Sequence, residues 1–289
     1  MEKSVSPVSA VDRDQARYPR VLTIAGSDSG GGAGIQADLK TMSALGCYGM
    51  TAITAITAQN TLGVTAIHGV PPAILKAQLQ AVLDDIGVDA VKIGMLHSPE
   101  MVEVVAWAID HYRIQNVVLD PVMVATSGDT LVGQDTVKVL VHELFGRALV
   151  VTPNLDEAAL LLGHAIESEA ALDQAAQDLL ALGARAALLK GGHLAGAQVV
   201  DVLARAGEPL LRLKSQRIDS RNVHGTGCTL SSAIACFLAL GIELPEAITQ
   251  ARAYILQAIA SGARVQTGHG HGPLNHGHAP VAMRLLAVE

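Results

Sequence analysis

Aromatic residues are scarce in this 289-residue chain: Phe, Trp and Tyr make up 2% of it, although half of its residues are hydrophobic. The apolar mass is therefore Ala, Val, Leu and Ile, a composition that suits buried parallel strands covered by helices. Basic residues are outnumbered by acidic ones, 20 to 27, which gives a net charge of −7. This balance argues against a nucleic-acid-binding protein, since such proteins usually carry a basic surface.

Cysteine is also rare, and its three occurrences (Cys47, Cys228, Cys236) form no Cys-x-x-Cys pair. The pattern argues against a disulfide framework or a zinc site and fits reduced thiols in the cytoplasm. No segment approaches the roughly 18 apolar residues of a membrane span. Residues 1–20 lack the apolar core of a signal peptide, so we expect them to form a flexible extension.

Apolar runs alternate with helical patterns over the rest of the chain, and we interpret residues 21–289 as one domain. Strands are predicted at 21–25, 51–57, 64–70, 90–95, 116–120, 148–152 and 186–190, with a hairpin at 199–204 and 209–213. Helices are predicted at 35–45, 72–86, 99–112, 135–145, 155–162, 169–182, 228–240 and 244–261. Such repeats indicate an α/β fold with a mostly parallel sheet, whose ligands bind beyond the carboxyl ends of the strands.

The most informative motif is NVHGTGC at 222–228, which runs directly into an apolar helix. Two glycines and a threonine at a helix start let backbone N–H groups point at one anion, and the helix dipole adds positive charge there. Such a site would stabilise the charge of a transferring phosphoryl group. An ordinary glycine turn capped by Thr226 explains the motif equally well, so both readings stay open here.

Cys228 lies in the first turn of that helix. Because a helix N-terminus favours the thiolate, we expect a lowered pKa and a role as general base or nucleophile. The alternative is an inert buried thiol, to which we assign Cys47 and Cys236.

A second glycine-rich turn, at 26–34, follows the first predicted strand. It has neither the GK[ST] ending of a Walker loop nor the G-x-G-x-x-G spacing of a dinucleotide site. We therefore favour a loop that lets a substrate approach closely over an NAD site. Asp38 follows shortly along the helix, either as part of that site or as a solvated charge.

Polar residues end three further predicted strands. Asp120 follows one apolar strand, and Asn154 and Glu157 follow the next. Two carboxylates at one sheet edge suit Mg²⁺, although Asn154 could simply cap a helix and Glu157 could favour its first turn. Lys190, before two glycines, can meet a phosphate or mark a plain turn.

The C-terminal segment 267–278 holds four of the 11 histidines. A histidine-rich tract can bind metal, but no Cys or carboxylate joins it. We therefore favour a glycine-rich closing loop over a metal site.

Taken together, these segments resemble the hydroxymethylpyrimidine and phosphomethylpyrimidine kinases of the ribokinase-like superfamily. The matching stretches, in family order from residue 21 to about 278, are TIAGSDSGGGAGIQADLK, TAITAQNT, KIGML, VLDPVMVATSG, TPNLDE, LKGGHL and NVHGTGCTL. The resemblance implies a single-domain three-layer sandwich, a homodimer, and ATP- and Mg²⁺-dependent phosphorylation of the pyrimidine alcohol and then of its monophosphate.

The resemblance also implies residue roles. The pyrimidine pocket falls on Gly26, Asp38, Gln59, Met95 and Val122. By this resemblance, Asn154, Lys190 and Thr226 bind the nucleotide, and Asp120 and Glu157 bind the metal. The anion hole consists of Gly225, Thr226 and Gly227. Cys228 stands where related sugar kinases place an aspartate base, and Thr126 stands where many relatives carry lysine.

Two other functions compete with this interpretation. A pyridoxal or pyridoxine kinase of the same superfamily would also phosphorylate a hydroxymethyl group on a flat ring, although Gln59 and Met95 favour the pyrimidine. A non-catalytic pyrimidine-binding regulator would keep the fold, but it would not need Asp120, Glu157, Lys190 and Cys228 together. A membrane or nucleic-acid partner is not expected.

Overall fold

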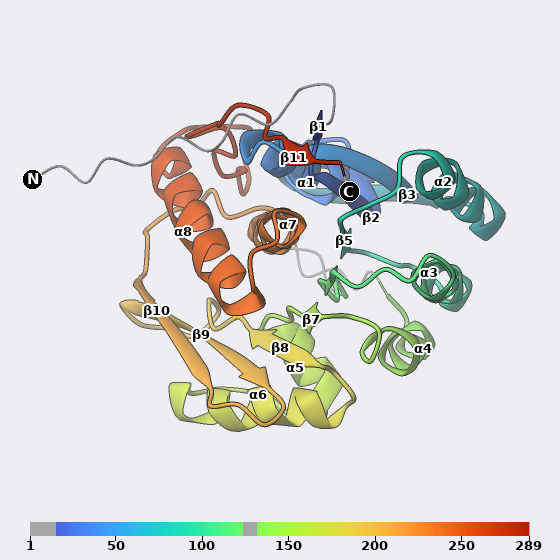
Figure 1. Ribbon diagram of the computed structural model, residues 1–289. Helices are drawn as coiled ribbons and strands as arrows, with labels where there is room; N and C mark the ends of the chain where they lie inside the picture. Colours follow the sequence, from blue (N-terminus) through green and yellow to red (C-terminus); the bar gives the residue numbers. More distant parts are fainter. Residues whose placement is uncertain (1–15, 124–131, 289) are drawn as a thin grey trace, which may run out of the picture.

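The computed structural model describes residues 16–123 and 132–288 (Figure 1). Thr126 and residues 1–15 of the predicted extension lie outside the described residues. The strands are β1 Ala16–Arg17, β2 Arg20–Asp28, β3 Tyr48–Asn60, β4 Gly63–Gly69, β5 Ala90–Ile93, β6 Val117–Leu119, β7 Val150–Val151, β8 Ala186–Leu189, β9 Gln198–Arg205, β10 Leu211–Gln216 and β11 Leu286–Ala287. The helices are α1 Gly34–Ala44, α2 Pro72–Asp85, α3 Pro99–His111, α4 Gln134–Leu144, α5 Leu155–Leu162, α6 Leu172–Ala181, α7 Thr226–Ala239 and α8 Leu244–Gly262, with a 3-10 turn, η2, at Glu169–Ala171.

The central sheet has nine strands in the order β10-β9-β8-β7-β6-β5-β2-β3-β4. The strands from β8 to β3 in this order run parallel. At one edge β9 pairs antiparallel with β8 and β10 antiparallel with β9, and at the other edge β4 pairs antiparallel with β3. The predicted mostly parallel sheet, the edge strand near 64–70 and the hairpin near 199–213 are therefore confirmed.

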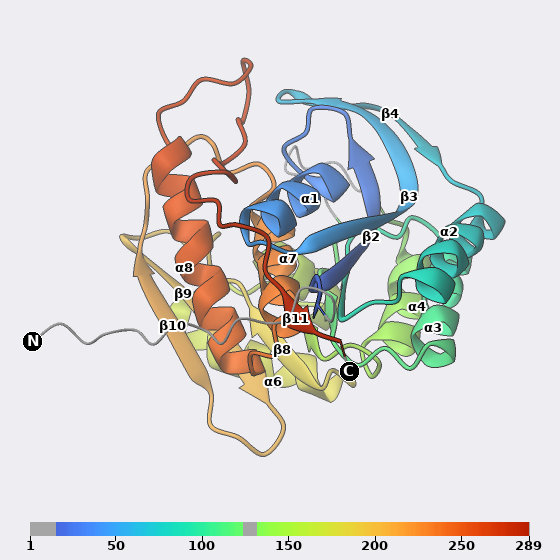
Figure 2. The ribbon, with the colours of Figure 1, turned by 45° about the horizontal axis from the view of Figure 1, so that its top comes forward.

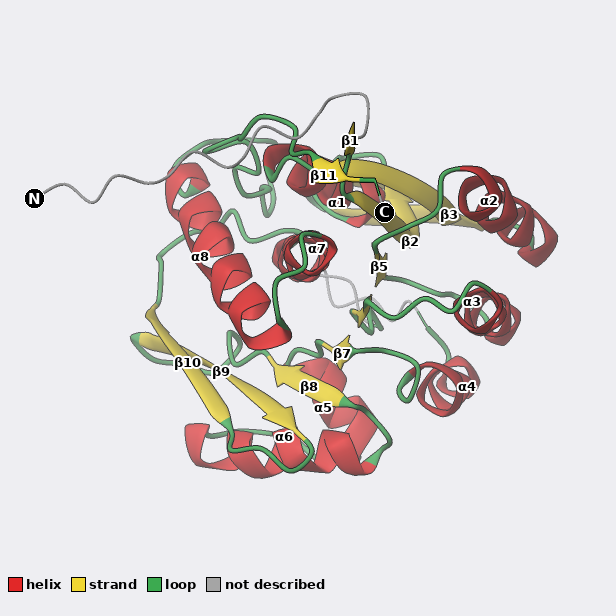
Figure 3. Ribbon diagram, in the orientation of Figure 1, coloured by secondary structure: helices red, strands yellow, loops and turns green. Residues whose placement is uncertain are grey.

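Helices cover both faces of this sheet (Figure 3). Alternate side chains of one strand enter different cores: Leu22 and Ile24 of β2 pack with α2 to α6, whereas Val21 packs with α1, α7 and α8. This alternation follows from the two-residue period of a strand. The predicted three-layer sandwich is confirmed.

The first described residues correct the predicted boundary at residue 20. Ala16 pairs with Ala287 and Arg17 with Leu286, so β1 and β11 tie the two ends of the described chain together. Arg17 and Arg20 also form ion pairs with Asp89, at 2.6 and 3.0 Å. Residues 16–20 are thus ordered rather than flexible, because a strand from the far end of the chain supplies their partner.

Strands β2 and β3 are longer than predicted. β3 runs past its parallel partner and turns into an antiparallel hairpin with β4, which projects beside α1 (Figure 2). A register shift between Ala58 and Gln59 interrupts this hairpin. The extension carries Gln59 two residues past Thr57, the last residue of β3 that pairs with β2.

The histidine-rich segment is a loop that packs on other loops. Its Gly272 carbonyl accepts the His224 N–H at 3.1 Å, and the His271 N–H donates to the Thr61 carbonyl at 3.0 Å. Among the described residues, no group of three His, Cys, Asp or Glu side chains is arranged to hold a metal ion. In the same part of the chain, no helix is long and apolar enough to cross a bilayer.

His276→Gln is expected to reduce the loss of stability in acid. His276 is 5% exposed, and burial, with Lys40 and His224 nearby, lowers its pKa to about 4. Below about pH 6.5 the His276 side chain binds a proton in the unfolded chain but not in the native state. The unfolding free energy is therefore at its full value above pH 6.5 and falls as the pH decreases toward 4. At pH 5 the loss amounts to about 2 kcal/mol.

Urea unfolding at pH 8 and pH 5 measures this effect. The fall in unfolding free energy should be about 2 kcal/mol smaller in the variant than in the wild type. His271→Gln, at an exposed position of the same loop, should keep the wild-type fall. Equal falls in all three proteins would contradict the prediction.

Candidate active site

Polar side chains from three neighbouring strands meet at the carboxyl edge of the sheet. Lys190, just after β8, places its Nζ 2.8 Å from Oδ1 of Asp120, just after β6. Thr152, after β7, donates to the same oxygen at 3.0 Å. Asp120 is only 2% exposed. Burial opposes its ionisation, but Lys190 and Lys92 hold its pKa below the usual range.

Asn154 and Glu157 form a capping box at the start of α5. The Asn154 side chain accepts the Glu157 N–H at 2.9 Å, and the Glu157 carboxylate accepts the Asn154 N–H at 2.8 Å. The helix-cap reading of Asn154 is therefore confirmed, and Glu157, expected as a charge in the first turn, is the second member of the same capping box. Burial raises the pKa of Glu157 to about 7. The ammonium of Lys190 partly opposes this rise, and the nearby Asp120 carboxylate adds to it. Lys190 thus acts on two buried carboxylates, Asp120 and Glu157.

Helix α7 begins against this cluster. Its N-cap, Gly225, has φ +82°, and within the described residues no side chain caps the helix. A Cβ on Gly227 would lie 3.2 Å from the Lys190 ammonium and 3.3 Å from an Asp120 oxygen. The Thr226 N–H donates to the Val223 carbonyl at 3.2 Å, whereas the next N–H groups of a helix start have no partner within their own helix. Together with the helix dipole, the start of α7 next to the ion pair is an arrangement that can bind anions.

The other glycine-rich turn is closed on itself. The Asp28 carboxylate accepts the N–H groups of Gly30, Gly32 and Ala33 at 2.8 to 3.0 Å, and lies 3.0 Å from His224 Nε2. Burial opposes ionisation of Asp28, but these hydrogen bonds keep its pKa below the usual range. Because its N–H groups point inward, this turn is not a phosphate loop, as its sequence indicated.

The prediction of a lowered pKa for Cys228 is wrong. Burial raises the pKa of this thiol to about 11, and the opposing effects of the Lys92 ammonium and the Gly34 N–H are smaller. The side chain still keeps some solvent access. At neutral pH Cys228 is therefore a thiol, because the cost of a buried charge exceeds the effect of the helix N-terminus. Cys47 and Cys236 are buried free thiols, as expected.

Most residues of the predicted pyrimidine pocket are linked to one another or to these elements. A Cβ on Gly26 would lie 2.8 Å from the Met95 methyl group, so the two residues are in close contact and a side chain at position 26 would displace the end of Met95. Gln59 Nε2 lies 3.4 Å from His224 Nε2, which connects the β3–β4 hairpin to the loop before α7. Val122 lies two residues after Asp120, and its N–H donates to the Asp120 carbonyl.

Asp38 differs from its predicted place in this pocket. It is fully buried and accepts two hydrogen bonds from Lys92 Nζ, both at 2.9 Å, and one each from Thr23 and Ser232. Ser232 lies one helical turn beyond Cys228 in α7. We therefore assign Asp38 to the support beneath Cys228 rather than to direct contact with substrate.

Comparisons with known proteins identify this arrangement. The family described as phosphomethylpyrimidine kinase matches residues 28–275. A hydroxymethylpyrimidine/phosphomethylpyrimidine kinase of Rhizobium meliloti is 53% identical over 258 residues, which cover 89% of this chain and 96% of that protein. The chain belongs to the phosphomethylpyrimidine kinase family.

Two further similarities define the place of the chain within this family and its fold. The thiamine biosynthesis bifunctional protein ThiED of Geobacter sulfurreducens is 53% identical over 264 residues, 91% of this chain but 53% of that protein. The ADP complex of Bacillus subtilis pyridoxal kinase aligns with a TM-score of 0.83 and 39% identity, over 90% of this chain and 98% of that one. The predicted ribokinase-like fold and a kinase of thiamine biosynthesis are confirmed. As a kinase, the protein takes its phosphate from ATP.

Three residues at the candidate site were given no role from the sequence: Lys92, Asp28 and His224. Lys92 carried the clearest signal, because a lysine inside the apolar strand AVKI requires a buried partner. Burial would lower its pKa, but the nearby acidic groups, with Asp38 foremost among them, together outweigh that effect and raise it. The partner lies 54 residues away, which the sequence pattern does not show.

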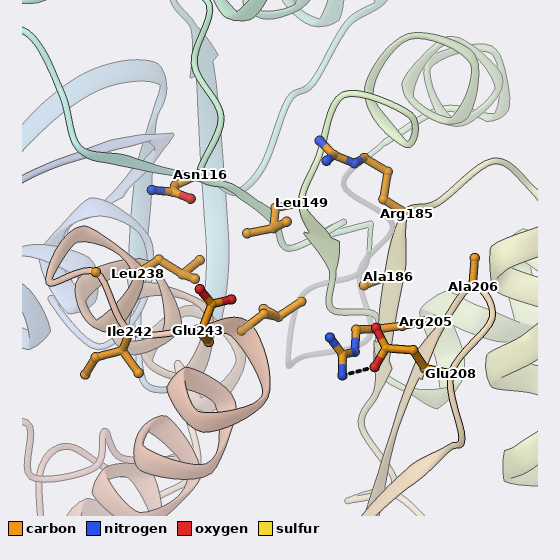
Figure 4. Close-up of a pocket in the computed structure, with 12 residues that line it drawn as sticks. Asn116, Leu149, Arg185, Ala186, Arg205, Ala206, Glu208, Leu238, Ile242 and Glu243 are labelled. Carbon is orange, nitrogen blue, oxygen red and sulfur yellow. Dashed lines mark ion pairs between the residues drawn. The ribbon is translucent and has the colours of Figure 1, made fainter.

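A cavity of about 510 Å³ lies away from this site (Figure 4). Asn116, Leu149 and Ala186 line it at the amino ends of β6, β7 and β8, and Arg205 pairs there with Glu208. None of the predicted site residues lines it. The candidate site lies at the opposite edge of the sheet, where the carboxyl ends of the parallel strands lie.

Proposed function

We propose that the protein transfers the γ-phosphate of ATP to the hydroxymethyl group of 4-amino-5-hydroxymethyl-2-methylpyrimidine, and then a second phosphate to the monophosphate. One observation carries the proposal: the uncapped start of α7 faces the Asp120–Lys190 pair, with Cys228 in the same turn. Developing charge on a phosphoryl group would meet N–H groups and an ammonium at this point. Asn154 and Thr226 complete the proposed nucleotide side.

In the proposed transfer, the substrate oxygen bonds to the γ-phosphorus as the bond to the ADP oxygen breaks, and the hydroxyl proton passes to the Cys228 thiolate. Because the thiol has a raised pKa, the thiolate is scarce at neutral pH but strongly basic. Phosphoryl transfer depends little on the strength of the base, so positioning by Gly225, Thr226 and Gly227 contributes most. Activity should still rise with pH above 7, because the fraction of Cys228 thiolate grows.

The proposed pyrimidine pocket lies between Gly26 and Met95 on one side and Gln59 on the other. Met95 offers an apolar surface to a flat ring, and Val122 adds to it. The Gln59 amide both donates and accepts hydrogen bonds, which suits a ring edge with an amino group and a ring nitrogen.

Mg²⁺ is part of the proposal because the donor set fits it. Asp120 and Glu157 offer hard oxygen ligands, and Lys190 pairs with Asp120. Mg²⁺ in kinases binds one or two carboxylates together with phosphates and water. These two residues would hold the ion, whose chemistry is to neutralise phosphate charge. Lys190 would then be free to contact the nucleotide phosphates.

Asp120→Asn is expected to raise the Mg²⁺ concentration for half-maximal activity at least about tenfold, because the variant loses one of two anionic ligands. Titrating activity with MgCl₂ at saturating ATP measures the change. Asp89→Asn, which weakens ion pairs with Arg17 and Arg20 away from the site, should leave the Mg²⁺ requirement unchanged. A normal requirement in Asp120→Asn would exclude Asp120 as a ligand.

A second candidate function is phosphorylation of pyridoxal, supported by the likeness to the Bacillus subtilis pyridoxal kinase at a TM-score of 0.83. ATP consumption with the pyrimidine alcohol and with pyridoxal, followed by mass analysis of products, distinguishes the two. The monophosphate and then the diphosphate of the pyrimidine would support the proposal. Pyridoxal phosphate alone would replace it with the second function, and no product from either would overturn both.

We also propose a homodimer and a cytoplasmic location. The β3–β4 hairpin ends the sheet and exposes Ile56, Leu62 and Ile67 by 53, 68 and 47%; open strand edges with apolar side chains favour pairing. Sedimentation should give a dimer that Ile67→Glu dissociates, and a wild-type monomer would contradict it. Free thiols at Cys47, Cys228 and Cys236 fit a reducing compartment, which cell fractionation tests.

A further inference from the structure

A buried ion pair lies behind the loop that follows Lys190. Arg252 of α8 donates from Nε to Oδ2 of Asp201 in β9 at 2.7 Å, and both side chains are 9% exposed. The other carboxylate oxygen of Asp201 accepts the N–H of Gly191 at 2.9 Å. Gly191 is the residue next to Lys190, so the pair holds the backbone from which the Lys190 side chain extends.

The same loop is held a second time, at its outer part. The Arg217 guanidinium donates to the carbonyl oxygens of Gly192 at 2.9 Å and Gly196 at 2.8 Å, and also to that of Leu194. On the inner side, the Lys190 N–H donates to the Pro153 carbonyl at 3.0 Å. Residues 190–197 are thus fixed by the side chains of Asp201 and Arg217 and by the Pro153 carbonyl, which follows β7.

Hydrophobic stabilisation alone does not explain an ion pair at this place. Taking a carboxylate and a guanidinium out of water is costly, and an apolar pair of similar volume is often as stable or more so. An apolar residue at Asp201 would, however, leave the Gly191 N–H without its acceptor. Nor can a side chain at Gly191 fill the space, because its Cβ would lie 2.0 Å from the Val200 carbonyl oxygen.

We infer that Asp201 and Arg252 are positioning residues for the nucleotide: they fix the Lys190–Gly191 backbone so that the lysine meets the phosphates of a nucleoside triphosphate. The inference rests on the proposed function, because the nucleotide is assigned to Lys190. The chain of contacts runs from α8 through Arg252, Asp201 and Gly191 to Lys190 and Asp120. Neither Asp201 nor Arg252 need touch the nucleotide.

Asp201→Asn tests the inference, since the amide keeps the size of the side chain but loses the charge that holds Arg252. We expect the Kd for a non-hydrolysable ATP analogue with Mg²⁺, measured by calorimetry without pyrimidine, to rise roughly ten- to hundredfold. The Kd for the pyrimidine alcohol should stay within about twofold. Asp89→Asn, at an ion pair far from the loop, should change neither constant. Weakened binding of both ligands by Asp201→Asn would indicate a general structural role and would overturn the inference.

Arg217→Gln keeps the test decisive if Asp201→Asn fails to fold, because Arg217 is exposed. Arg217→Gln should raise the Kd for the ATP analogue several-fold, while pyrimidine binding and thermal stability stay close to wild type. Wild-type affinity for the analogue in Arg217→Gln, or in folded Asp201→Asn, would overturn the inference. The binding test is independent of turnover. If the protein binds the analogue but does not phosphorylate the pyrimidine, the proposed substrate is contradicted, and the effect of Asp201→Asn on analogue binding still tests the positioning role.

Discussion

Cys228→Ala is expected to lower kcat about 10²- to 10⁴-fold, the usual contribution of a positioned general base. The residue lies in the first turn of α7, near the buried Lys92–Asp38 pair. Its removal takes away the proton acceptor but leaves Asp120, Lys190 and the glycines in place. The Kd for ATP should therefore remain close to the wild-type value.

Steady-state kinetics over pH 6.5 to 9.5 should be compared between wild type and variant. Because the thiol pKa is about 11, wild-type kcat should rise over this range as the thiolate fraction grows, and the residual rate of the variant should not follow it. Cys236→Ala, on the same helix and fully buried, should keep the wild-type pH profile. An unchanged kcat in Cys228→Ala would exclude the base role.

Gly225→Ala is expected to lower kcat/KM at least about 100-fold. Two physical effects combine at this position. The residue has φ +82°, where a side chain costs about 1–2 kcal/mol. In addition, the new Cβ would lie 1.8 Å from the Gly32 carbonyl oxygen. The two glycine-rich loops must move apart, and the N–H groups of α7 move with them.

Gly207→Ala separates the two effects. Its φ is +75°, close to that of Gly225, but no atom lies within 4 Å of the added Cβ. It should therefore lower the unfolding free energy by about 1–2 kcal/mol with little change in kcat/KM. Thermal unfolding and kinetics of both variants measure the difference. Similar kinetics in the two would show that the contact between the loops is not needed for activity.

Local signals predicted the elements well where the pattern depends on neighbours in the chain. The predicted helix at 155–162 matches α5, because Asn154 and Glu157 cap it within four residues. The strand ends also placed Asp120 and Lys190 correctly, since carboxyl ends of parallel strands share one edge. Strands β1 and β11 were missed, because each is paired only with a segment at the other end of the chain.

The surroundings of a charge were predicted less well. The helix N-terminus was expected to dominate the pKa of Cys228, yet burial outweighs it. Asp38 was expected near the substrate, yet it is fully enclosed by Lys92, Thr23 and Ser232. Asp201 and Arg252 carried no signal at all, because an ion pair across 51 residues leaves no local pattern.

The sequence by itself determined the α/β class, the order of the strands and helices along the chain, the family and the motifs of the site. These follow from periodicity, turn residues and short contiguous segments, which depend on near neighbours. Only the tertiary structure decided which of the motif residues are buried, which ion pairs they form and which way the Cys228 pKa shifts. Desolvation and Coulomb energies depend on atoms within a few ångströms, and in this fold those atoms come from distant parts of the chain.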